Sequence, residues 1–299
     1  MNKEVITHGF RQLQDRICKR LESIDGRALF HEDLWDRNDG GGGRTRVLSK
    51  GEIIEKGGVN FSEVYGDVTE LMRQNTEING NSFYATGVSI VLHPNSPHLP
   101  IIHMNVRYFE LDNGKYWFGG GIDLTPHYVV PNQAQQFHAR LKSVCDKYKS
   151  DFYPRFKEWA DNYFFLPHRD ETRGVGGIFF DHLNESEGLS KQEIFNFCVE
   201  LGDTFAELYS YQVDKGVQCK VNSKHIEWRN LRRGRYVEFN LVNDRGTKFG
   251  LISGGRTESI LMSLPSMASW EYNKAVSPDS DEAKTLTHLK KNLDWLNYS

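Results

Sequence analysis

Residues 103–126, HMNVRYFELDNGKYWFGGGIDLTP, contain the side chains whose types and spacing best suit chemistry. The segment is typical of two strands joined by a tight turn, and residues 101–111 alternate in polarity. The apolar side chains of this first strand point to one face, and His103, Asn105 and Arg107 point to the other. A titratable imidazole, an amide and a fixed cation therefore form a row where an ordinary strand carries interchangeable polar residues.

The turn at residues 112–114, Asp-Asn-Gly, determines which residues face this row. A two-residue Asn-Gly loop would pair Met104 with Asp123. A three-residue loop, with Gly114 in the left-handed conformation, would pair His103 with Asp123, Asn105 with Gly121 and Arg107 with Gly119. We prefer the second register, because it gathers polar groups on one face and sets glycine opposite the longest side chains.

The second strand has two features that bear on function. Its consecutive glycines at 119–121 weaken a strand, so they either leave room for a ligand against the sheet or form a bulge. Asp123 either caps a helix or anchors a loop, or it faces His103 in a pocket as a functional carboxylate with a shifted pKa. On the functional interpretation, replacing Asp123 by alanine would stop turnover and leave the fold intact.

Arginines in glycine-rich surroundings form a second candidate set, because guanidinium groups bind carboxylates and phosphates at two points. A surface ion pair is the simpler explanation for any single one, but we expect several to converge on one polyanionic small molecule. Nucleic acid suits them less, because the basic residues form no stripe with aromatic side chains. The set comprises Arg107, Arg169, Arg173, Arg232, Arg233, Arg235 and Arg256.

Histidines form a third set, His93, His103, His138 and His168, which lacks the close ligand pairs of zinc sites. A hydrogen-bonded core or hairpin histidine is the commoner role for each. The four cysteines are also far apart, and we expect free buried thiols. Dinucleotide-binding, phosphate-loop and nucleophile-elbow motifs are missing, so nothing in the sequence supports nicotinamide, flavin or nucleotide chemistry.

Composition bounds the class of protein. The chain has 299 residues, 38% hydrophobic and 26% charged, with a net charge of −3 at pH 7. No segment approaches the ~18 apolar residues of a membrane span. The first residues, MNKEVITHGF, lack the pattern of a signal peptide. We therefore expect a cytoplasmic protein with no membrane span and no nucleic-acid partner.

The remaining patterns predict the elements around the central hairpin. Helices are expected at residues 3–25, from Asn132, at 151–165, after a capping box of Ser190 and Glu193, and at 281–296. Strands or hairpins are expected at 45–55, 82–93, 175–180 and 235–252, and glycine loops, the first of them mobile, at 40–43 and 57–58. We predict an α+β fold, a large antiparallel β-sheet flanked by α-helices on both faces, in a single domain over residues 1–299.

Five long motifs resemble one known family: HxNVRYFE at 103–110, WFGGGxDLTP at 117–126, RGxGGIFFD at 173–181, RRGRYVEFNLxxDRGTKFGL at 232–251 and GGRTESILMSLP at 254–265. The loops GGGGRTRVL and GVNFSEVYG resemble it too. The family is that of the oxygen-dependent (aerobic) coproporphyrinogen III oxidases, and the resemblance extends over roughly residues 12–295.

The resemblance implies an enzyme of haem biosynthesis. Such an enzyme oxidatively decarboxylates two propionates of coproporphyrinogen III to vinyl groups, giving protoporphyrinogen IX, with molecular oxygen as co-substrate. The resemblance also implies a homodimer and no organic cofactor. From the residues alone, a non-catalytic tetrapyrrole carrier and a histidine–metal oxygenase remain as alternatives.

The resemblance also implies roles for individual residues. His103 is the proton donor, and Asp123 holds the pyrrole nitrogens. Arg169 and Arg173 matter for activity, with propionate binding as one role. The substrate contacts are Ser89, Asn105, Val106, Arg107, Gly254, Gly255 and Arg256.

Metal binding is a point of conflict in the resemblance. His93, His103, His138 and His168 match positions that bacterial members use as divalent-metal ligands. The mechanism usually drawn for the family is free of any cofactor. In it, the deprotonated pyrrole reduces oxygen, and the resulting peroxide removes a propionate β-hydrogen before CO2 leaves.

Overall fold

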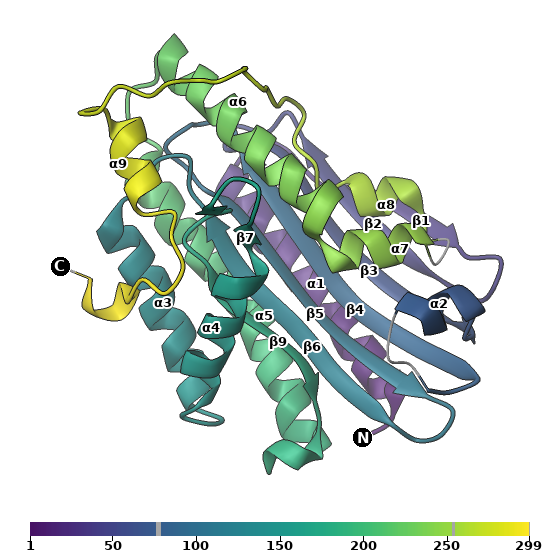
Figure 1. Cartoon of the computed structure of the whole chain (residues 1–299). Coiled ribbons are helices and arrows are strands. Elements are labelled where there is room, and N and C mark those ends of the chain that lie inside the picture. The colour runs from purple at the N-terminus through teal and green to yellow at the C-terminus, as the bar shows by residue number, and fades with distance from the viewer. Residues whose placement is uncertain (76–78, 253–254, 299) are drawn as a thin grey trace.

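The computed structural model describes residues 1–75, 79–252 and 255–298. A seven-stranded antiparallel sheet in the order β1-β2-β3-β4-β5-β6-β9 forms its centre (Figure 1). The strands are β1 (His31–Asp36), β2 (Gly41–Ser49), β3 (Ile54–Asp67), β4 (Ser82–Pro94), β5 (Ile101–Leu111), β6 (Tyr116–Thr125) and β9 (Gly177–Leu183). Strands that are neighbours in the sheet are also consecutive strands of the chain, except that β9 joins β6 only after two helices and the short pair β7 (Phe165–Leu166) and β8 (Glu171–Thr172).

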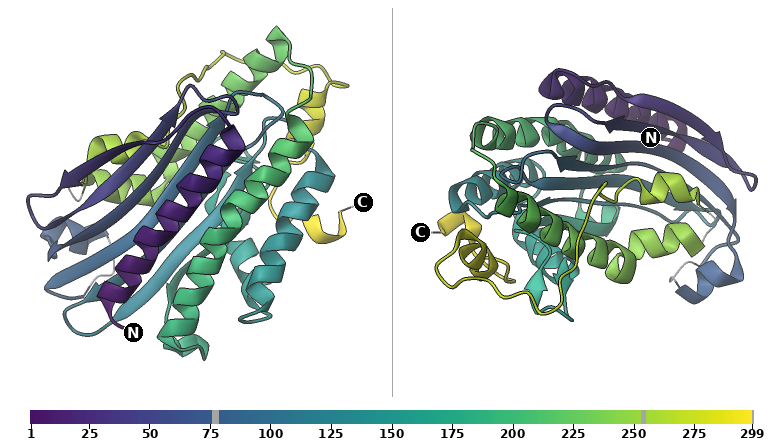
Figure 2. Two further views of the ribbon diagram at one scale, coloured as in Figure 1. Left: turned by 180° about the vertical axis from the view of Figure 1, so that it is seen from behind. Right: turned by 90° about the horizontal axis from the view of Figure 1, so that it is seen from above.

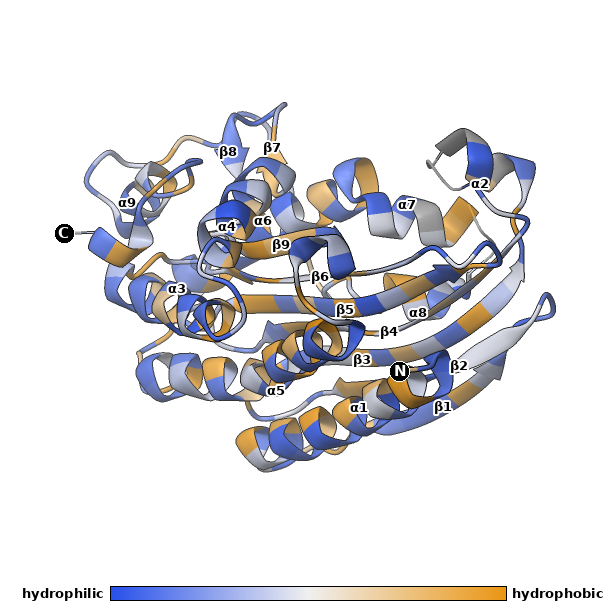
Figure 3. Cartoon of the chain, turned by 90° about the horizontal axis from the view of Figure 1, so that it is seen from below, coloured by the Kyte–Doolittle hydropathy of each residue, from blue (hydrophilic) through white to orange (hydrophobic). Residues whose placement is uncertain are grey.

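Helices cover both faces of the sheet, as predicted. Figures 2 and 3 show α1 and α5 along one face and α6, α7 and α8 over the other. The helices are α1 (Lys3–Asp25), α2 (Glu70–Asn75), α3 (Pro131–Asp146), α4 (Phe152–Tyr163), α5 (Lys191–Gly216), α6 (Ser223–Glu238), α7 (Arg245–Ile252), α8 (Thr257–Leu261) and α9 (Asp281–Thr287). The α+β class with a large antiparallel sheet in a single domain is therefore confirmed.

The two faces of the sheet differ in chemistry. On the side of α1 and α5, the apolar set of β5, including Met104 and Val106, is fully buried in the main hydrophobic core. On the side of α6 to α8, His103, Asn105 and Arg107 are only half-buried. The alternation seen in the sequence thus separates a dry core face from an accessible polar face.

Glycine was misinterpreted at two places. The predicted mobile loop at 40–43 is wrong, because β2 begins at Gly41, and the predicted loop at 57–58 lies inside β3. A Cβ at Gly43 would lie 2.3 Å from the Trp35 ring, and one at Gly58 would lie 2.5 Å from Met262 Sδ. These glycines therefore permit close packing onto the strands rather than a break in them.

The predicted hairpin at 235–252 is also wrong. Helix α6 continues to Glu238, a π-helical turn follows at Phe239–Asn243, and α7 comes next. The helix sends Arg233 to Glu55 and Arg232 to Glu171, and it places Tyr236 and Phe239 against Arg173. Tertiary contacts thus override the strand propensity of this sequence.

Smaller differences concern the ends of elements. Val130 is the N-cap of α3 in place of Asn132, because Pro131 is suited to the first helical position. The predicted last helix ends at Thr287, and the predicted strand at 175–180 is shifted to β9. The helix at residues 3–25 and the capping box of Ser190 and Glu193 are confirmed.

Two findings concern the composition-based expectations. In the described part of the chain, no helix is long and apolar enough to cross a membrane. All four cysteines are free thiols; Cys18, Cys145 and Cys198 are buried as expected, but Cys219 is exposed.

Asp25 joins the end of α1 to the hairpin between β2 and β3. Its side chain is buried and accepts hydrogen bonds from five backbone N–H groups, those of residues 27, 28 and 52–54, at 2.9–3.4 Å. Burial opposes ionisation of Asp25, but these donors outweigh it and lower its pKa. A Cβ at Gly51 would lie 2.2 Å from Oδ2 of Asp25, so glycine is needed there.

We predict that Asp25→Asn lowers the free energy of unfolding by about 1–3 kcal/mol at pH 7, because its amide would face N–H donors. A carboxylate with a lowered folded pKa stabilises the protein above its unfolded pKa, and that contribution is lost as the pH falls through the folded value. Urea denaturation from pH 7 to pH 3 should therefore show the gap to wild type narrowing. Asp279→Asn, at an exposed position, is the control. A gap that stays constant over this range would contradict the role of Asp25.

Candidate active site

The hairpin of β5 and β6 has the register that the three-residue turn predicts. Gly114 adopts a φ of 83°, and its N–H bonds the carbonyl of Leu111. His103 is opposite Asp123, Asn105 opposite Gly121 and Arg107 opposite Gly119. The polar row, Gly119 and Gly121 therefore share one face, beneath α6 to α8.

Asp123 lies between the side chains of His103 and Arg173. Its Oδ1 is 2.7 Å from Nδ1 of His103, and its Oδ2 accepts a 2.6 Å hydrogen bond from the Arg173 guanidinium. Burial opposes ionisation of the Asp123 carboxyl, but the charge of Arg173 and the bond to His103 outweigh it and lower its pKa. With both oxygens engaged and only 2% of Asp123 exposed, the pair fixes the orientation of His103.

Arg173 is held in an aromatic cage. The rings of Phe164, Tyr236 and Phe239 lie 4.4–4.6 Å from its guanidinium carbon. Its second terminal nitrogen donates to Oδ1 of Asn240 at 3.0 Å. Cation–π contacts and hydrogen bonds thus replace the water that a buried guanidinium loses. Arg173 therefore acts as the anchor of Asp123 and is not free to receive a propionate.

His103 is the accessible member of this group. Its ring is 17% exposed, against 3% for the side chain of Asp123. Nδ1 faces Asp123, and among the described residues nothing hydrogen-bonds Nε2. An imidazole whose Nδ1 is held by a carboxylate can exchange a proton through Nε2. The geometry thus presents His103, rather than Asp123, to a ligand on this face.

Arg107 and Asn105 continue the row. Arg107 donates to Oδ1 of Asn105 at 2.8 Å and to Oδ2 of Asp181, on β9, at 2.7 Å. The pair crosses over Gly119, where a Cβ would lie 2.5 Å from Oδ1 of Asp181. At 37% exposure, the Arg107 side chain remains open to a carboxylate. One of the three glycines of β6 thus makes room for this ion pair.

Of the other expected substrate contacts, some lie on the face of the polar row and some do not. Ser89 is opposite Asn105 on β4 and half-buried, so it belongs to the same row. The side chain of Val106 lies on the other face, in the core, so a contact between Val106 and a ligand on this face would involve its backbone. Gly254 lies outside the described residues, and Gly255 bonds the carbonyl of Gly250.

The arginines do not converge on one open site. Each has a carboxylate partner, as in the simpler explanation by ion pairs: Arg107 with Asp181, Arg169 with Glu238, Arg173 with Asp123, Arg232 with Glu171, Arg233 with Glu55, Arg235 with Glu238 and Arg256 with Asp33. Glu238 accepts a two-point hydrogen bond from Arg169. Partial burial would raise the pKa of Glu238, but Arg169 and Arg235 outweigh it and lower this pKa to about 2.

The four candidate metal ligands lie apart with separate partners. Both ring nitrogens of His138 are occupied, by the hydroxyl of Tyr153 and the carbonyl of Val175, and burial lowers its pKa to about 4. His93 bonds the Ser263 carbonyl beneath α6, and burial lowers its pKa to about 3. His168 is exposed beside Glu238. Within the described ranges, no group of three or more His, Cys, Asp or Glu could hold a metal ion, so these residues do not fit a shared site.

Sequence reasoning missed two residues of the site. Asp181 pairs with Arg107, and Asn240 holds Arg173. Asp181 ends the GIFFD motif, whose single acidic residue after four apolar or small ones could have indicated it. Asn240 had no such signal, because its segment was predicted as a strand.

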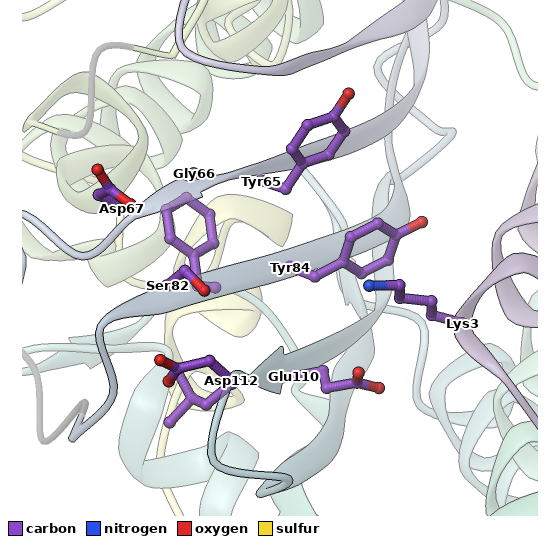
Figure 4. Close-up of a pocket in the computed structure, with 10 residues that line it drawn as sticks. Lys3, Tyr65, Gly66, Asp67, Ser82, Tyr84, Glu110 and Asp112 are labelled. Atoms are coloured by element: carbon purple, nitrogen blue, oxygen red, sulfur yellow. The ribbon is translucent and has the colours of Figure 1, made fainter.

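A pocket of about 430 Å³ lies away from this row, at the far ends of β3, β4 and β5 (Figure 4). Lys3, Tyr65 and Tyr84 line it, and the ammonium of Lys3 is 4.9 Å from the Tyr84 ring. The Tyr84 hydroxyl is bonded to Thr7 and Glu63. None of the predicted site residues lines this pocket.

Comparison with known protein families identifies the family of this chain. The family model described as coproporphyrinogen III oxidase matches residues 5–295, which is nearly the whole chain. The matched range includes the polar row, the Asp123–Arg173 pair and the helices that cover them. The chain therefore belongs to the family of oxygen-dependent coproporphyrinogen III oxidases, enzymes of haem biosynthesis that convert two propionates of coproporphyrinogen III to vinyl groups and give protoporphyrinogen IX.

Proposed function

We propose that the oxidative decarboxylation takes place on the polar face of β4 to β6, with His103 as the residue that exchanges protons with the substrate. One observation carries this proposal: the buried Asp123 carboxylate holds Nδ1 of His103 and leaves Nε2 without a hydrogen-bond partner among the described residues, on the same face of the sheet as Ser89, Asn105 and Arg107. Asp123 is then a positioning residue that orients His103, and it does not itself contact the pyrrole nitrogens.

The proton balance of the reaction supports this division of roles. Each propionate loses one β-hydrogen and CO2, and its two electrons go to oxygen, so that propionate, O2 and one proton give vinyl, CO2 and hydrogen peroxide. In the proposed sequence, Nε2 of His103 takes the pyrrole N–H proton, the electron-rich ring reduces O2, and the resulting peroxide removes the β-hydrogen. His103 then returns its proton to the ring nitrogen.

Arg107 is proposed to bind a propionate that does not react. Its guanidinium can bind a carboxylate at two points. The carboxylate that leaves as CO2 must not be stabilised as strongly in the ground state. If Arg107 binds a neighbouring propionate, it orients the macrocycle without opposing the departure of CO2.

The proposed sequence uses no organic cofactor and no metal ion, and O2 is the second substrate. The positions of the four histidines support this, because they fit no common ion. The homodimer and the cytoplasmic location rest on the family resemblance and the composition. Sedimentation equilibrium of the purified protein tests the dimer directly.

We predict that Asp123→Asn lowers kcat by about 100-fold or more, on the scale of a lost proton-transfer role. The amide cannot hold the imidazole as a carboxylate does. Asp123→Ala, in contrast, is expected to unfold the protein readily, since it leaves Arg173 buried and unpaired at a cost of about 3–5 kcal/mol. The structure thus replaces the expectation that alanine leaves the fold intact. Porphyrin fluorescence after auto-oxidation of the product measures turnover, and circular dichroism measures folding.

Asp161→Asn is the matched control for Asp123→Asn. Asp161 is also buried and paired with a cation, Lys157, but it lies on α4 away from the row. Replacement of Asp161 should lower the free energy of unfolding and leave kcat per folded molecule unchanged. Near-normal turnover by folded Asp123→Asn would refute the proposed role of the pair.

We predict that Arg107→Lys weakens substrate binding by about 1–3 kcal/mol, because lysine keeps the charge and loses the two-point fork. Steady-state kinetics measures this as a rise in KM or a fall in kcat/KM. Arg16→Lys is the control, since Arg16 makes a two-point bond to Asp203 at the contact of α1 and α5. Unchanged kinetics for Arg107→Lys would remove Arg107 from the binding site.

A further inference from the structure

A second polar row crosses the sheet at right angles to β5 and extends from β5 to β1. Asp33, Thr45, Asn60, Ser89 and Asn105 are directly opposite one another on β1 to β5. Directly opposite residues of an antiparallel sheet share a face. Asn60 and Thr45 therefore lie on the face of the proposed substrate site.

Thr45 holds the side chain of Asn60 in place. Its hydroxyl donates to Oδ1 of Asn60 at 2.7 Å, accepts from Nε1 of Trp35 at 3.0 Å and shares a 2.7 Å bond with the hydroxyl of Ser259 on α8. A threonine hydroxyl has one donor and two acceptor positions. All three are used, so Ser259 is the donor in the last bond. The network fixes which way the Asn60 amide points.

The amide nitrogen of Asn60 is free in this arrangement. Across the residues that the structure describes, no oxygen accepts a hydrogen bond from Nδ2 of Asn60. Asn60 is half-buried, as are Ser89 and Asn105, whereas Val59 beside it is fully buried on the other face. Two N–H donors are thus held rigidly on an accessible polar face with no protein partner.

Two cations flank this position. Arg256 reaches one end of the row through a 2.5 Å contact with Asp33, and Arg107 reaches the other end through its 2.8 Å bond to Asn105. Adjacent strands are ~4.8 Å apart, so these ends are roughly 19 Å apart, with Asn60 halfway between them. When two carboxylates of a macrocycle with four propionates lie at these two cations, its other carboxylates lie between the cations, where Asn60 is.

We propose that Asn60 is a substrate-binding residue whose Nδ2 donates to a propionate carboxylate, and that Thr45 is its positioning residue. The proposal rests on the proposed function, because it takes this face as the substrate site. A neutral amide binds a carboxylate less tightly than a guanidinium does. The position therefore suits a propionate whose carboxylate leaves as CO2.

The test compares Asn60→Asp, Asn60→Ala and wild type in two assays. Aspartate keeps the shape and the acceptor for Thr45, but it removes both donors and adds a negative charge. We expect kcat/KM to fall by about tenfold or more, the scale of a hydrogen bond to a charged group. Fluorescence titration with coproporphyrin III, the non-reacting oxidised macrocycle, should show a matching loss of affinity. Asn2→Asp is the control, since it adds the same charge at the exposed N-cap of α1, where aspartate also caps.

The positioning role of Thr45 has its own readout. Thr45→Val should lower affinity for coproporphyrin III several-fold, and Thr45→Ser, which keeps the hydroxyl, should restore it. In the Asn60→Ala background, Thr45→Val should cause no further loss, as a double-mutant cycle requires for two residues that act through one contact.

Affinity for coproporphyrin III that is unchanged in folded Asn60→Asp or Asn60→Ala would overturn the proposal. If Arg107→Lys still weakens binding in that case, the substrate face stands and only Asn60 is excluded. If neither position affects binding, the proposed face itself is wrong and the inference falls with it.

Discussion

The buried ion pair of Asp123 and Arg173 is the contact on which the rest of the site depends. Both side chains are only 3% exposed, and removal of a single partner would leave a charge without water or counter-ion. The pair is held from several directions at once, by His103, by Asn240 and by three aromatic rings. One interaction therefore connects the central hairpin, the segment after β8 and the π-helical turn after α6.

This constraint explains features that propensity alone does not. The end of α6 and the π-helical turn after it are rich in residues that favour strands, yet they are helical, and this helical path brings Tyr236, Phe239 and Asn240 onto Arg173. The π-helical turn lies where this contact is made, as such turns often do at functional sites. The resulting site has little net positive charge, since every candidate arginine already has a carboxylate partner. A tetra-anionic substrate would have to compete with Asp181 for Arg107, which favours discrimination by geometry over strong attraction.

The sequence predicted the local features of the fold well and the distant contacts poorly. The hairpin register followed from one turn and from the steric need for glycine opposite long side chains, and the bounds of α1 and the capping box of α5 followed from local patterns. The partners of the arginines could not be predicted in this way, because Glu55 and Arg233 are far apart in the chain and meet only through the fold. Gly43 and Gly58 were misinterpreted for the same reason, since the side chains that pack on them come from other elements. Asn60 lacked any local signal, because its importance depends on which neighbours the sheet sets beside it.

The tautomer of His103 tests the central claim most directly. If the Asp123 carboxylate, held by Arg173, fixes this imidazole, Nδ1 carries the proton and Nε2 is the nitrogen that exchanges with the substrate. Nitrogen-15 NMR of histidine-labelled protein distinguishes a protonated ring nitrogen from an unprotonated one. For neutral His103 the account predicts a protonated Nδ1 and an unprotonated Nε2, with this preference lost in Asp123→Asn. A wild-type protein in which Nε2 carries the proton and Nδ1 does not would contradict it.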